Sequence, residues 1–392
     1  MVCETVMSNL KQNKNKKKKL LFICNRASYF NMHWRYRALN AIKAGYDVYV
    51  AVPELPTRED AEELKWVEFN LDRRSRNPLT ELFSGYALLN TIRKIKPDLI
   101  HSITIKPNLY SGFISRFIGD IPVVMSVTGL GYLFIDQSFS TSVIRELAKM
   151  AYRWIGKSDN VTLLFENWDD RKLFLDSGIG NEKRCIRIPG AGIDLTEYYP
   201  SPELDGIPVV MLPSRMLWDK GVMEFVEAAK ILKDKGVKAK FVLVGDTDQG
   251  NPKAVPSTSL KCWADEGYVE WWGFQENMVN IFSKSNIVCL PSYREGLPRA
   301  LIEAAACARA IVTTDVPGCR EIVKHGKNGL LVPAKDSTSL ATALEKLINE
   351  QGMREKMGCM GREFALREYS QERVLSMTLK IYDAILCRVP NI

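Results

Sequence analysis

The chain has 392 residues, of which 46% are hydrophobic and 26% charged, and its formal net charge at pH 7 is +8. This composition is typical of a folded globular protein with room for two domains, and it excludes a chain that is disordered throughout. A membrane-spanning helix needs roughly 20 apolar residues, whereas the longest candidate, residues 121–135, is interrupted by Ser, Thr and Gly. We therefore expect no spanning segment.

The N-terminal end is strongly basic, since residues 11–19 read KQNKNKKKK. Taken alone, such a run is more often a solvated, disordered leader, and we expect residues 1–19 to form a disordered tail. The alternative is attraction to anionic lipid, worth about 1 kcal/mol per Lys near the surface. Nucleic acid is not expected as a partner, because no aromatic and basic interleaving accompanies the run.

The same end lacks an apolar signal core with a small-residue cleavage site, so no export signal is expected. The nine cysteines show no Cys-x-x-Cys spacing, and several, such as Cys24, Cys289 and Cys307, stand in apolar runs. This usage is typical of buried, reduced thiols and predicts a cytoplasmic protein.

The first half of the chain alternates strand-like and helix-like segments. Strands are predicted at 20–24, 46–52, 99–102, 123–127 and 161–165. A polar loop is predicted at 25–31, and helices are predicted from there up to residue 44, at 78–94 and at 141–154. This alternation predicts an α/β fold with a parallel sheet covered by helices on both faces. Because ligands of such sheets gather at the carboxyl ends of the strands, a binding rim is expected at residues 25–31, 101–106, 128–132 and Asn167.

A second α/β unit follows a linker at residues 200–208, which contains three Pro, one Gly and no periodicity. Its strands are predicted at 209–212, 241–245, 269–274, 286–290 and 310–314, and helices at 337–350, 353–368 and 371–386. No internal sequence repeat of 20–50 residues is present. The two halves therefore repeat only an architecture.

Within the second unit, residues 291–303 read PSYREGLPRALIE and join the strand at 286–290 to a helix rich in Ala, Leu and Glu. Pro298 suits the first helical position, and Gly296 lets the loop backbone approach a ligand closely. The helix N-terminus favours a phosphate, because its amides are free and its dipole end is positive.

Two glutamates in this segment extend the same binding surface. Glu295 is an acceptor suited to hydroxyl groups. Glu303 lies five residues into the helix that starts near Pro298, roughly 7.5 Å along its axis from the phosphate end. Phosphate and polyol together indicate a sugar nucleotide. Considered without their neighbours, the two carboxylates would more often be solvated residues beside a core helix.

The Glu-x7-Glu spacing resembles the donor-site motif of retaining glycosyltransferases of the GT-B group called family 4. Four further sequence segments, which stand in the family's order along the chain, make the resemblance specific. They are SRMLWDKG at 214–221, FVLVG at 241–245, TDVPGCREI at 314–322 and GKNGLLV at 326–332.

The resemblance implies two Rossmann-like domains facing a cleft. Residues 20–200 would bind the acceptor, residues 201–370 the nucleotide sugar, and residues 371–392 would form a helix crossing back to the first domain. The resemblance also implies that Arg215 and Lys220 hold the diphosphate and stabilise its developing charge, each charge-assisted bond being worth about 1.5–3 kcal/mol.

The resemblance assigns the donor sugar to Glu295, which together with Arg215 and Lys220 would form the catalytic set. Further donor contacts are expected at Gly245, Phe274, Gly296, Leu297, Pro298 and Glu303. Asp246-Thr-Asp248 has the Asp-x-Asp pattern of metal-dependent transferases, but its position after 241–245 matches the family's nucleotide loop. No metal or other cofactor is therefore expected.

The acceptor side is expected to use His101, Lys106, Thr128, Gly129 and Asn167. Many family 4 members carry a His where this chain has Gly129, so a His contact to the donor is not expected. For His101, contact with substrate and a plain structural hydrogen bond are about equally expected. The Gly-Leu-Gly at 129–131 also resembles part of a dinucleotide loop, but the third Gly is missing.

Residues 129–134, 165–170 and 189–194 resemble a narrower branch that extends polyprenyl-diphosphate-linked glycans with N-acetylhexosamine-type sugars. The resemblance implies transfer, with retention, from a UDP-sugar to a hydroxyl of a lipid-linked saccharide in cell-surface glycan biosynthesis. Such an enzyme would work in the cytoplasm at the anionic inner face of the membrane. The alternatives are a nucleotide-sugar epimerase and a non-catalytic binding protein of the same fold.

Overall fold

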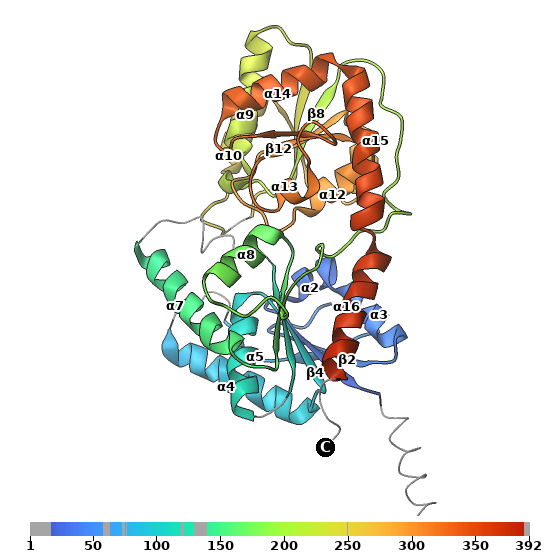
Figure 1. Cartoon of the computed structure of the whole chain (residues 1–392). Coiled ribbons are helices and arrows are strands. Elements are labelled where there is room, and N and C mark those ends of the chain that lie inside the picture. The colour runs from blue at the N-terminus through green and yellow to red at the C-terminus, as the bar shows by residue number, and fades with distance from the viewer. Residues whose placement is uncertain are drawn as a thin grey trace, which may run out of the picture.

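The computed structural model describes residues 17–57, 63–72, 75, 77–118, 121–128, 139–248 and 250–387. They form two α/β domains that lie one above the other in Figure 1. Most of the basic N-terminal tail and Gly129, both singled out above, lie outside the described residues. Among the helices described, none combines the length and the apolar character that crossing a membrane requires.

The N-terminal domain is built on a seven-stranded parallel sheet in the order β3-β2-β1-β4-β5-β6-β7. The side chains of its central strands are buried on both sides, because helices cover both faces of the sheet. The strands are β1 (Lys19–Ile23), β2 (Asp47–Val52), β3 (Lys65–Glu68), β4 (Leu99–Ile103), β5 (Val123–Val127), β6 (Val161–Phe165) and β7 (Cys185–Arg187). The helices are α2 (Ala27–His33), α3 (Arg35–Lys43), α4 (Pro78–Ile95), α5 (Ile105–Ile118), α7 (Phe139–Gly156) and α8 (Trp168–Asp176).

The C-terminal domain repeats this plan with a six-stranded parallel sheet in the order β10-β9-β8-β11-β12-β13. The strands are β8 (Val209–Pro213), β9 (Lys240–Val244), β10 (Glu270–Gly273), β11 (Ile287–Leu290), β12 (Ala310–Thr314) and β13 (Leu330–Val332). The short helix η1 (Trp218–Lys220) precedes α9 (Val222–Asp234). The remaining helices are α10 (Ser257–Asp265), α11 (Met278–Ser283), α12 (Arg299–Ala306), α13 (Cys319–Ile322), α14 (Ser337–Asn349) and α15 (Gln351–Glu368).

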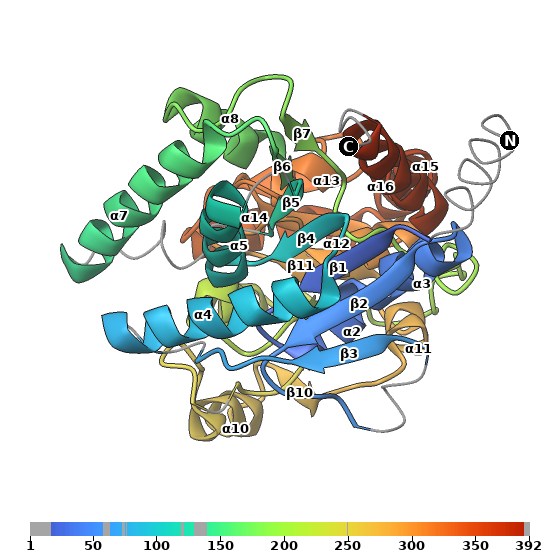
Figure 2. The ribbon, with the colours of Figure 1, turned by 90° about the horizontal axis from the view of Figure 1, so that it is seen from below.

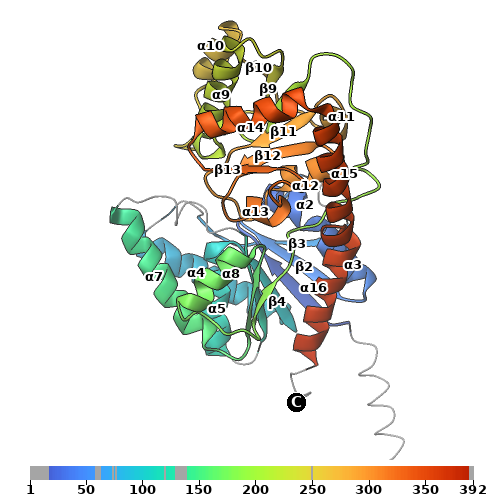
Figure 3. The same ribbon diagram turned by 45° about the horizontal axis from the view of Figure 1, so that its top comes forward.

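The last helix, α16 (Gln371–Leu386), leaves the C-terminal domain and packs on the N-terminal domain beside α3, as Figures 1 and 3 show. The Tyr46 hydroxyl donates to Asp383 Oδ1 over 2.8 Å. At the crossing point, the backbone N–H of Ile193 donates to Tyr369 O over 2.9 Å, and that of Gln371 donates to Ile193 O over 3.0 Å. The two domains are therefore joined at two places along the chain.

The prediction of an α/β chain with two parallel sheets is confirmed. Strands β5, β6 and β12 have the predicted bounds, whereas the edge strands β3 and β7 were not predicted. The prediction of a loop at residues 25–31 was wrong, because α2 begins at Ala27, and the buried Trp34 separates α2 from α3. Helix α5 was not predicted, and the expected rim at residues 101–106 runs into it, because Thr104, at φ 74°, turns the chain directly into α5. Pro107 lies in the first turn of α5, where its missing N–H costs nothing.

Candidate active site

A cavity of about 600 Å³ lies between the two domains and is lined by residues of both. In a parallel sheet the loops that follow the strands are the usual binding elements, and both sheets contribute such loops here. The N-terminal domain supplies Tyr29, His33, Thr128 and Glu166, among others, and the C-terminal domain supplies Arg215, Lys220, Phe274, Glu295, Gly296, Leu297, Pro298 and Glu303.

The centre of the C-terminal wall is an ion pair between Lys220 and Glu295, whose Nζ and Oε1 atoms are 2.5 Å apart. The Ser292 hydroxyl donates to the same carboxylate oxygen over 2.7 Å. Both ionic side chains are largely buried, at 20% and 11% exposure. Their mutual attraction is therefore only weakly screened by water, and the pair is held in position by the loop itself.

Gly221 explains how these two loops come so close. It has φ 74°, and a Cβ built on it would lie 2.1 Å from Pro291 O. Only a residue without a Cβ fits this position. The loop carrying Lys220 is consequently pressed against the start of the loop carrying Glu295.

Arg215 also lines the cavity, and its side chain is 61% exposed. Its Nη1 lies 2.7 Å from Asp248 Oδ2. The pKa of Asp248 is lowered, chiefly by a hydrogen bond from Asn251 and also by the Arg215 charge. The Arg215 guanidinium is thus held beside the cavity by the Asp248 carboxylate, which stays ionised.

Gly245 was expected to touch the donor, but it is not among the described residues that line the cavity. A Cβ at this position would lie 2.0 Å from Ser214 O, so Gly245 allows the loop after β9 to pack on the loop after β8. The neighbouring Asp246 accepts a hydrogen bond of 3.2 Å from the backbone N–H of Phe274. Gly245 therefore supports the site from behind, whereas Phe274, 65% exposed, faces the cavity.

Glu303 lies deeper in the cavity wall and is 7% exposed. Burial raises the pKa of its carboxyl, and the nearby Arg299 opposes that shift. Arg299 Nε lies 2.7 Å from Glu303 Oε1, one helical turn away, and its Nη1 donates to Met32 O of the other domain over 2.9 Å. Helix α12 begins at Arg299, so Pro298 occupies the N-cap and not the first helical position.

No group of three or more His, Cys, Asp or Glu side chains suited to a metal ion occurs in the part of the chain that the structure describes. Within the Asp246-Thr-Asp248 segment, each of the two carboxylates has a protein partner, as described above. Both belong to the scaffold that positions Phe274 and Arg215.

The expected acceptor residues separate into distinct groups. Thr128 lines the cavity. His101 does not, and the expectation of a substrate contact is corrected: its ring is fully buried, bonds the Tyr382 hydroxyl and lies 2.8 Å from Ser126 Oγ. Burial holds its pKa well below the usual value. Lys106 is corrected as well, since its ammonium donates to Glu81 and to the backbone oxygens of residues 72 and 75.

Asn167 is fully buried and caps α8, accepting from the backbone N–H of Asp170 over 2.7 Å. Its Nδ2 reaches across the domain boundary and donates to Gly296 O over 2.7 Å. It is not among the described residues that line the cavity, so the expectation of a direct acceptor contact is corrected. Asn167 positions the donor loop instead.

Glu166 was not predicted as a site residue, although it immediately precedes Asn167 and follows β6. Burial raises its pKa to about 7, Arg37 opposes this shift, and the charges of Asp170 and Glu295 add to it. His33 is a second missed residue: burial and then the charge of Arg299 lower its pKa to about 4. The available signal was position alone, since both residues lie in loops or helices that directly follow strands.

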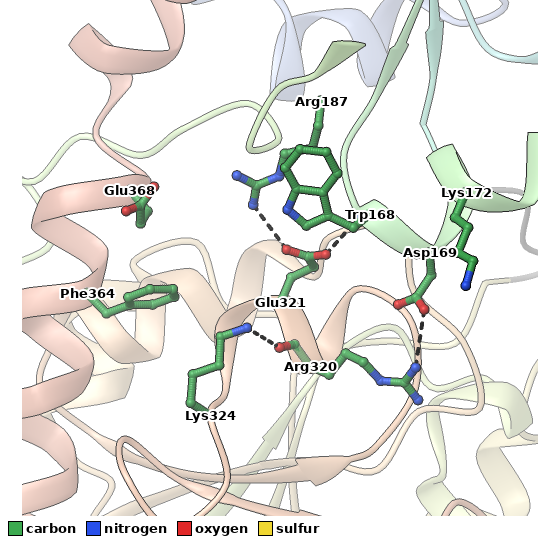
Figure 4. A pocket seen from close by; sticks show the side chains of 9 residues that line it. All are labelled: Trp168, Asp169, Lys172, Arg187, Arg320, Glu321, Lys324, Phe364 and Glu368. Carbon is green, nitrogen blue, oxygen red and sulfur yellow. Dashed lines mark hydrogen bonds and ion pairs between the residues drawn. The ribbon is translucent and has the colours of Figure 1, made fainter. Parts of the chain in front are cut away.

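A second crevice, of about 450 Å³, lies at the domain boundary and is drawn in Figure 4. Here Glu321 accepts from the backbone N–H of Trp168 over 2.8 Å and from Arg187 over 3.2 Å. Arg320 lies 3.3 Å from Asp169. These contacts join α13 to α8 and β7, so they hold the two domains together beside the cavity.

Comparison with known proteins assigns both halves of the chain. Residues 207–350 match the family described as "Glycosyl transferases group 1", and residues 19–163 match "Glycosyl transferase 4-like". A Campylobacter jejuni protein named N,N'-diacetylbacillosaminyl-diphospho-undecaprenol alpha-1,3-N-acetylgalactosaminyltransferase is 29% identical over 374 residues, which cover 91% of this chain and 96% of that protein.

Solved structures agree in fold. Sucrose-phosphate synthase from Thermosynechococcus elongatus superposes with a TM-score of 0.79 at 18% identity, over 95% of this chain and all of that chain. Anabaena HepE in complex with UDP-glucose has a TM-score of 0.75 at 18% identity, over 93% and 99% of the two chains. Since the two family matches fall one on each of two Rossmann-like domains, the chain is a GT-B glycosyltransferase of the group 1 and 4-like families.

Proposed function

We propose that this glycosyltransferase moves an N-acetylhexosamine from its UDP-linked form to a hydroxyl of a polyprenyl-diphosphate-linked saccharide, with retention at the anomeric carbon. The observation that carries the proposal is the cavity between the domains, where Arg215, Lys220, Glu295 and Glu303 come together. The Campylobacter relative, which spans nearly the same length, is named for a transfer of this class.

In this proposal Lys220 and Arg215 bind the diphosphate of the donor. Each leaves a carboxylate partner, Glu295 and Asp248 respectively, for phosphate oxygens. Glu295, released from Lys220, accepts hydrogen bonds from the sugar hydroxyls. Glu303, held by Arg299, accepts from the ribose hydroxyls. Two cations near the leaving group stabilise the charge that develops as the bond breaks.

The reaction breaks the bond between the anomeric carbon and the diphosphate oxygen and forms one from that carbon to the acceptor oxygen. UDP leaves with the bonding electrons, and the acceptor proton passes to the departing phosphate. We propose attack from the same face as the leaving group, assisted by the departing phosphate that takes the acceptor proton. The two cations take the electrostatic part that a metal ion has in other transferases, so we propose metal-independent transfer.

The acceptor lipid would place the enzyme at the anionic inner face of the cytoplasmic membrane, with the basic run at residues 11–19 as one point of attraction. We propose a cytoplasmic enzyme that associates peripherally with that surface.

The test is a transfer assay with a panel of UDP-, GDP-, ADP- and dTDP-sugars and a short-chain prenyl-diphosphate-linked acceptor, each with and without EDTA. We expect one UDP-N-acetylhexosamine to give an α-linked product at the same rate in both conditions. Loss of transfer in EDTA would contradict the proposal that transfer needs no metal ion. Conversion of the donor without any acceptor would instead indicate an epimerase, and binding without turnover would indicate a non-catalytic protein.

A further inference from the structure

Helix α4 exposes a stripe of large apolar side chains to solvent. Leu79, Leu82, Phe83 and Tyr86 are 64%, 70%, 70% and 61% exposed. Their spacing of three and four residues puts them on one side of the helix. The opposite side, with Leu88, packs into the domain core. The stripe is thus directed outward, where a surface helix usually carries polar residues.

Helix α7 repeats this arrangement. Val143, Leu147 and Met150 are 45%, 55% and 51% exposed and follow one another at spacings of four and three. The buried side of the same helix carries Tyr152 and Ile155. Both helices therefore have a core side and a second apolar side that no described part of the protein covers.

Helix α5 connects the two stripes. Phe113 and Phe117 are 38% and 78% exposed, and their rings lie 5.2 Å and 5.9 Å from that of Trp154 on α7. On the other side, Lys106 of α5 lies 2.7 Å from Glu81 of α4. Figure 2 shows α4, α5 and α7 side by side, remote from α3 and α16. The outward apolar stripes of these three helices are hereafter called the apolar face.

The charges around the apolar face are mostly positive. In sequence, the three helices contain two carboxylates, Glu81 and Glu146, against seven Lys or Arg residues. Glu81 is paired with Lys106, and Glu146 lies 2.8 Å from Lys149. Arg116 stacks over the Trp154 ring at 4.5 Å. Aliphatic and aromatic side chains bordered by cations are typical of helices that lie in a membrane interface.

The position of the apolar face relates it to the cavity. In a doubly wound domain the helices begin at the end of the sheet where the strands finish, which is the end that carries the cavity. The stripe of α4 occupies the first half of that helix, and the stripe of α7 occupies the middle of its helix. Thr128, which lines the cavity, follows β5, and α7 is the next described helix. The apolar face thus extends toward the rim of the cavity.

We propose that the apolar face docks on an anionic lipid bilayer. Its apolar side chains enter the boundary between headgroups and acyl chains, and its Lys and Arg side chains contact lipid phosphates. Large exposed apolar surfaces of soluble proteins mark interaction sites, and the positive charge selects an anionic bilayer as the occupant. The proposal rests on the proposed function only because the acceptor lipid would lie in that bilayer.

The test is co-sedimentation with vesicles of phosphatidylcholine, with and without phosphatidylglycerol. Two double variants remove the stripes without adding charge: Leu82→Ser with Phe83→Ser, and Leu147→Ser with Met150→Ser. The matched control is Met360→Ser with Leu366→Ser, which removes comparably exposed side chains, 41% and 48%, from α15. We expect each stripe variant to bind the anionic vesicles at least about tenfold more weakly, because burial of two large side chains is lost.

The control should bind like the unmodified protein, and all variants should turn over a short-chain soluble acceptor equally well. Undiminished vesicle binding by both stripe variants would overturn the proposal, as would the abolition of vesicle binding by deleting residues 1–16 alone, a deletion that leaves β1 intact. A dimer in sedimentation velocity that the stripe substitutions dissociate, with vesicle binding unchanged, would assign the face to a second copy. Vesicle binding involves no transfer, so a protein that binds vesicles but transfers no sugar contradicts the proposed function and not the apolar face.

Discussion

Asn167 Nδ2 lies 2.7 Å from Gly296 O, so a buried side chain of the N-terminal domain holds the loop that carries Glu295 in the C-terminal domain. The relationship makes the geometry of the donor loop depend on the position of the other domain. A change in the angle between the domains would move the Gly296 carbonyl and with it the carboxylate beside it.

Replacing Asn167 tests this dependence. We expect Asn167→Ala to lose the α8 cap and the contact to Gly296, at a cost of about 1–2 kcal/mol in the free energy of unfolding. Asn167→Ser keeps a capping oxygen for α8 but loses the hydrogen bond donated to Gly296 O, and it adds no buried charge beside Asp170. It should retain more stability and still raise KM for the donor. Chemical denaturation and donor titration measure the two effects, and an unchanged KM in both variants would contradict the positioning role.

The Lys220 and Glu295 pair gives the sharpest test of the donor site. We expect Lys220→Ala and Glu295→Gln to reduce kcat/KM at least a thousandfold, since each removes a contact to the reacting part of the donor. Lys238→Ala, an exposed cation of the same domain, is the control and should be fully active. Near-normal turnover in either site variant, with the control also active, would contradict the donor-binding role of the residue replaced.

Glu166 predicts a pH dependence near neutrality. Its pKa of about 7 lies above the ordinary value of 4.5, so the native carboxyl is protonated below pH 7 and ionised above it. If the ionised form orients the acceptor hydroxyl, kcat should rise through pH 7 to a plateau. Glu166→Gln should lower kcat and remove the rise. A rate profile of the variant that keeps the same inflection would assign the inflection to another group.

The same group links stability to pH. Because the folded pKa is raised, the native state binds more protons than the unfolded state between about pH 4.5 and 7. The free energy of unfolding should therefore fall as pH rises through this window, and Glu166→Gln should abolish that part of the fall. Thermal unfolding at several pH values compares the two proteins, and parallel curves would contradict the raised pKa.

Gly221 offers a stability test with an internal control. Gly221→Ala and Gly236→Ala both place a Cβ on a left-handed residue, at φ 74° and 78°, which costs about 1–2 kcal/mol. At Gly236 the Cβ meets nothing within 4 Å, whereas at Gly221 it would overlap Pro291 O. We expect Gly221→Ala to cost a further 1–3 kcal/mol, by analogy with overpacking, and to lower turnover. Equal loss of stability in the two variants would mean that the loop with Gly221 can move away from Pro291 at no further cost in free energy.

Helices and strands whose apolar pattern is visible in the local sequence could be predicted. Helix α16 has the predicted bounds, and β5, β6 and β12 follow from short runs of buried apolar residues. Helix α5 was missed because Pro107 and the polar residues before it are as typical of a loop as of a first helical turn. The edge strands β3 and β7 have too few residues to show a period.

The site divides in the same way. Lys220, Arg215 and the two glutamates were readable because one local segment or motif carries each of them. The structural role of His101 could not be predicted from the sequence, since its partner Tyr382 is 281 positions away. Asn167 was placed at the correct end of its strand, but its bond to Gly296 spans 129 positions and depends on how two domains meet. Glu166 has a raised pKa through burial, which no sequence pattern displays.

The return of α16 has a consequence for how the protein comes into being. Tyr382 and Val374 belong to the buried core of the N-terminal domain, together with residues of β1 and α3. During synthesis this domain lacks part of its interior until the final residues emerge, so it cannot complete folding before the C-terminal domain has been made. Cutting the gene at the linker would therefore yield one incomplete half, and the functional unit of folding is the whole chain.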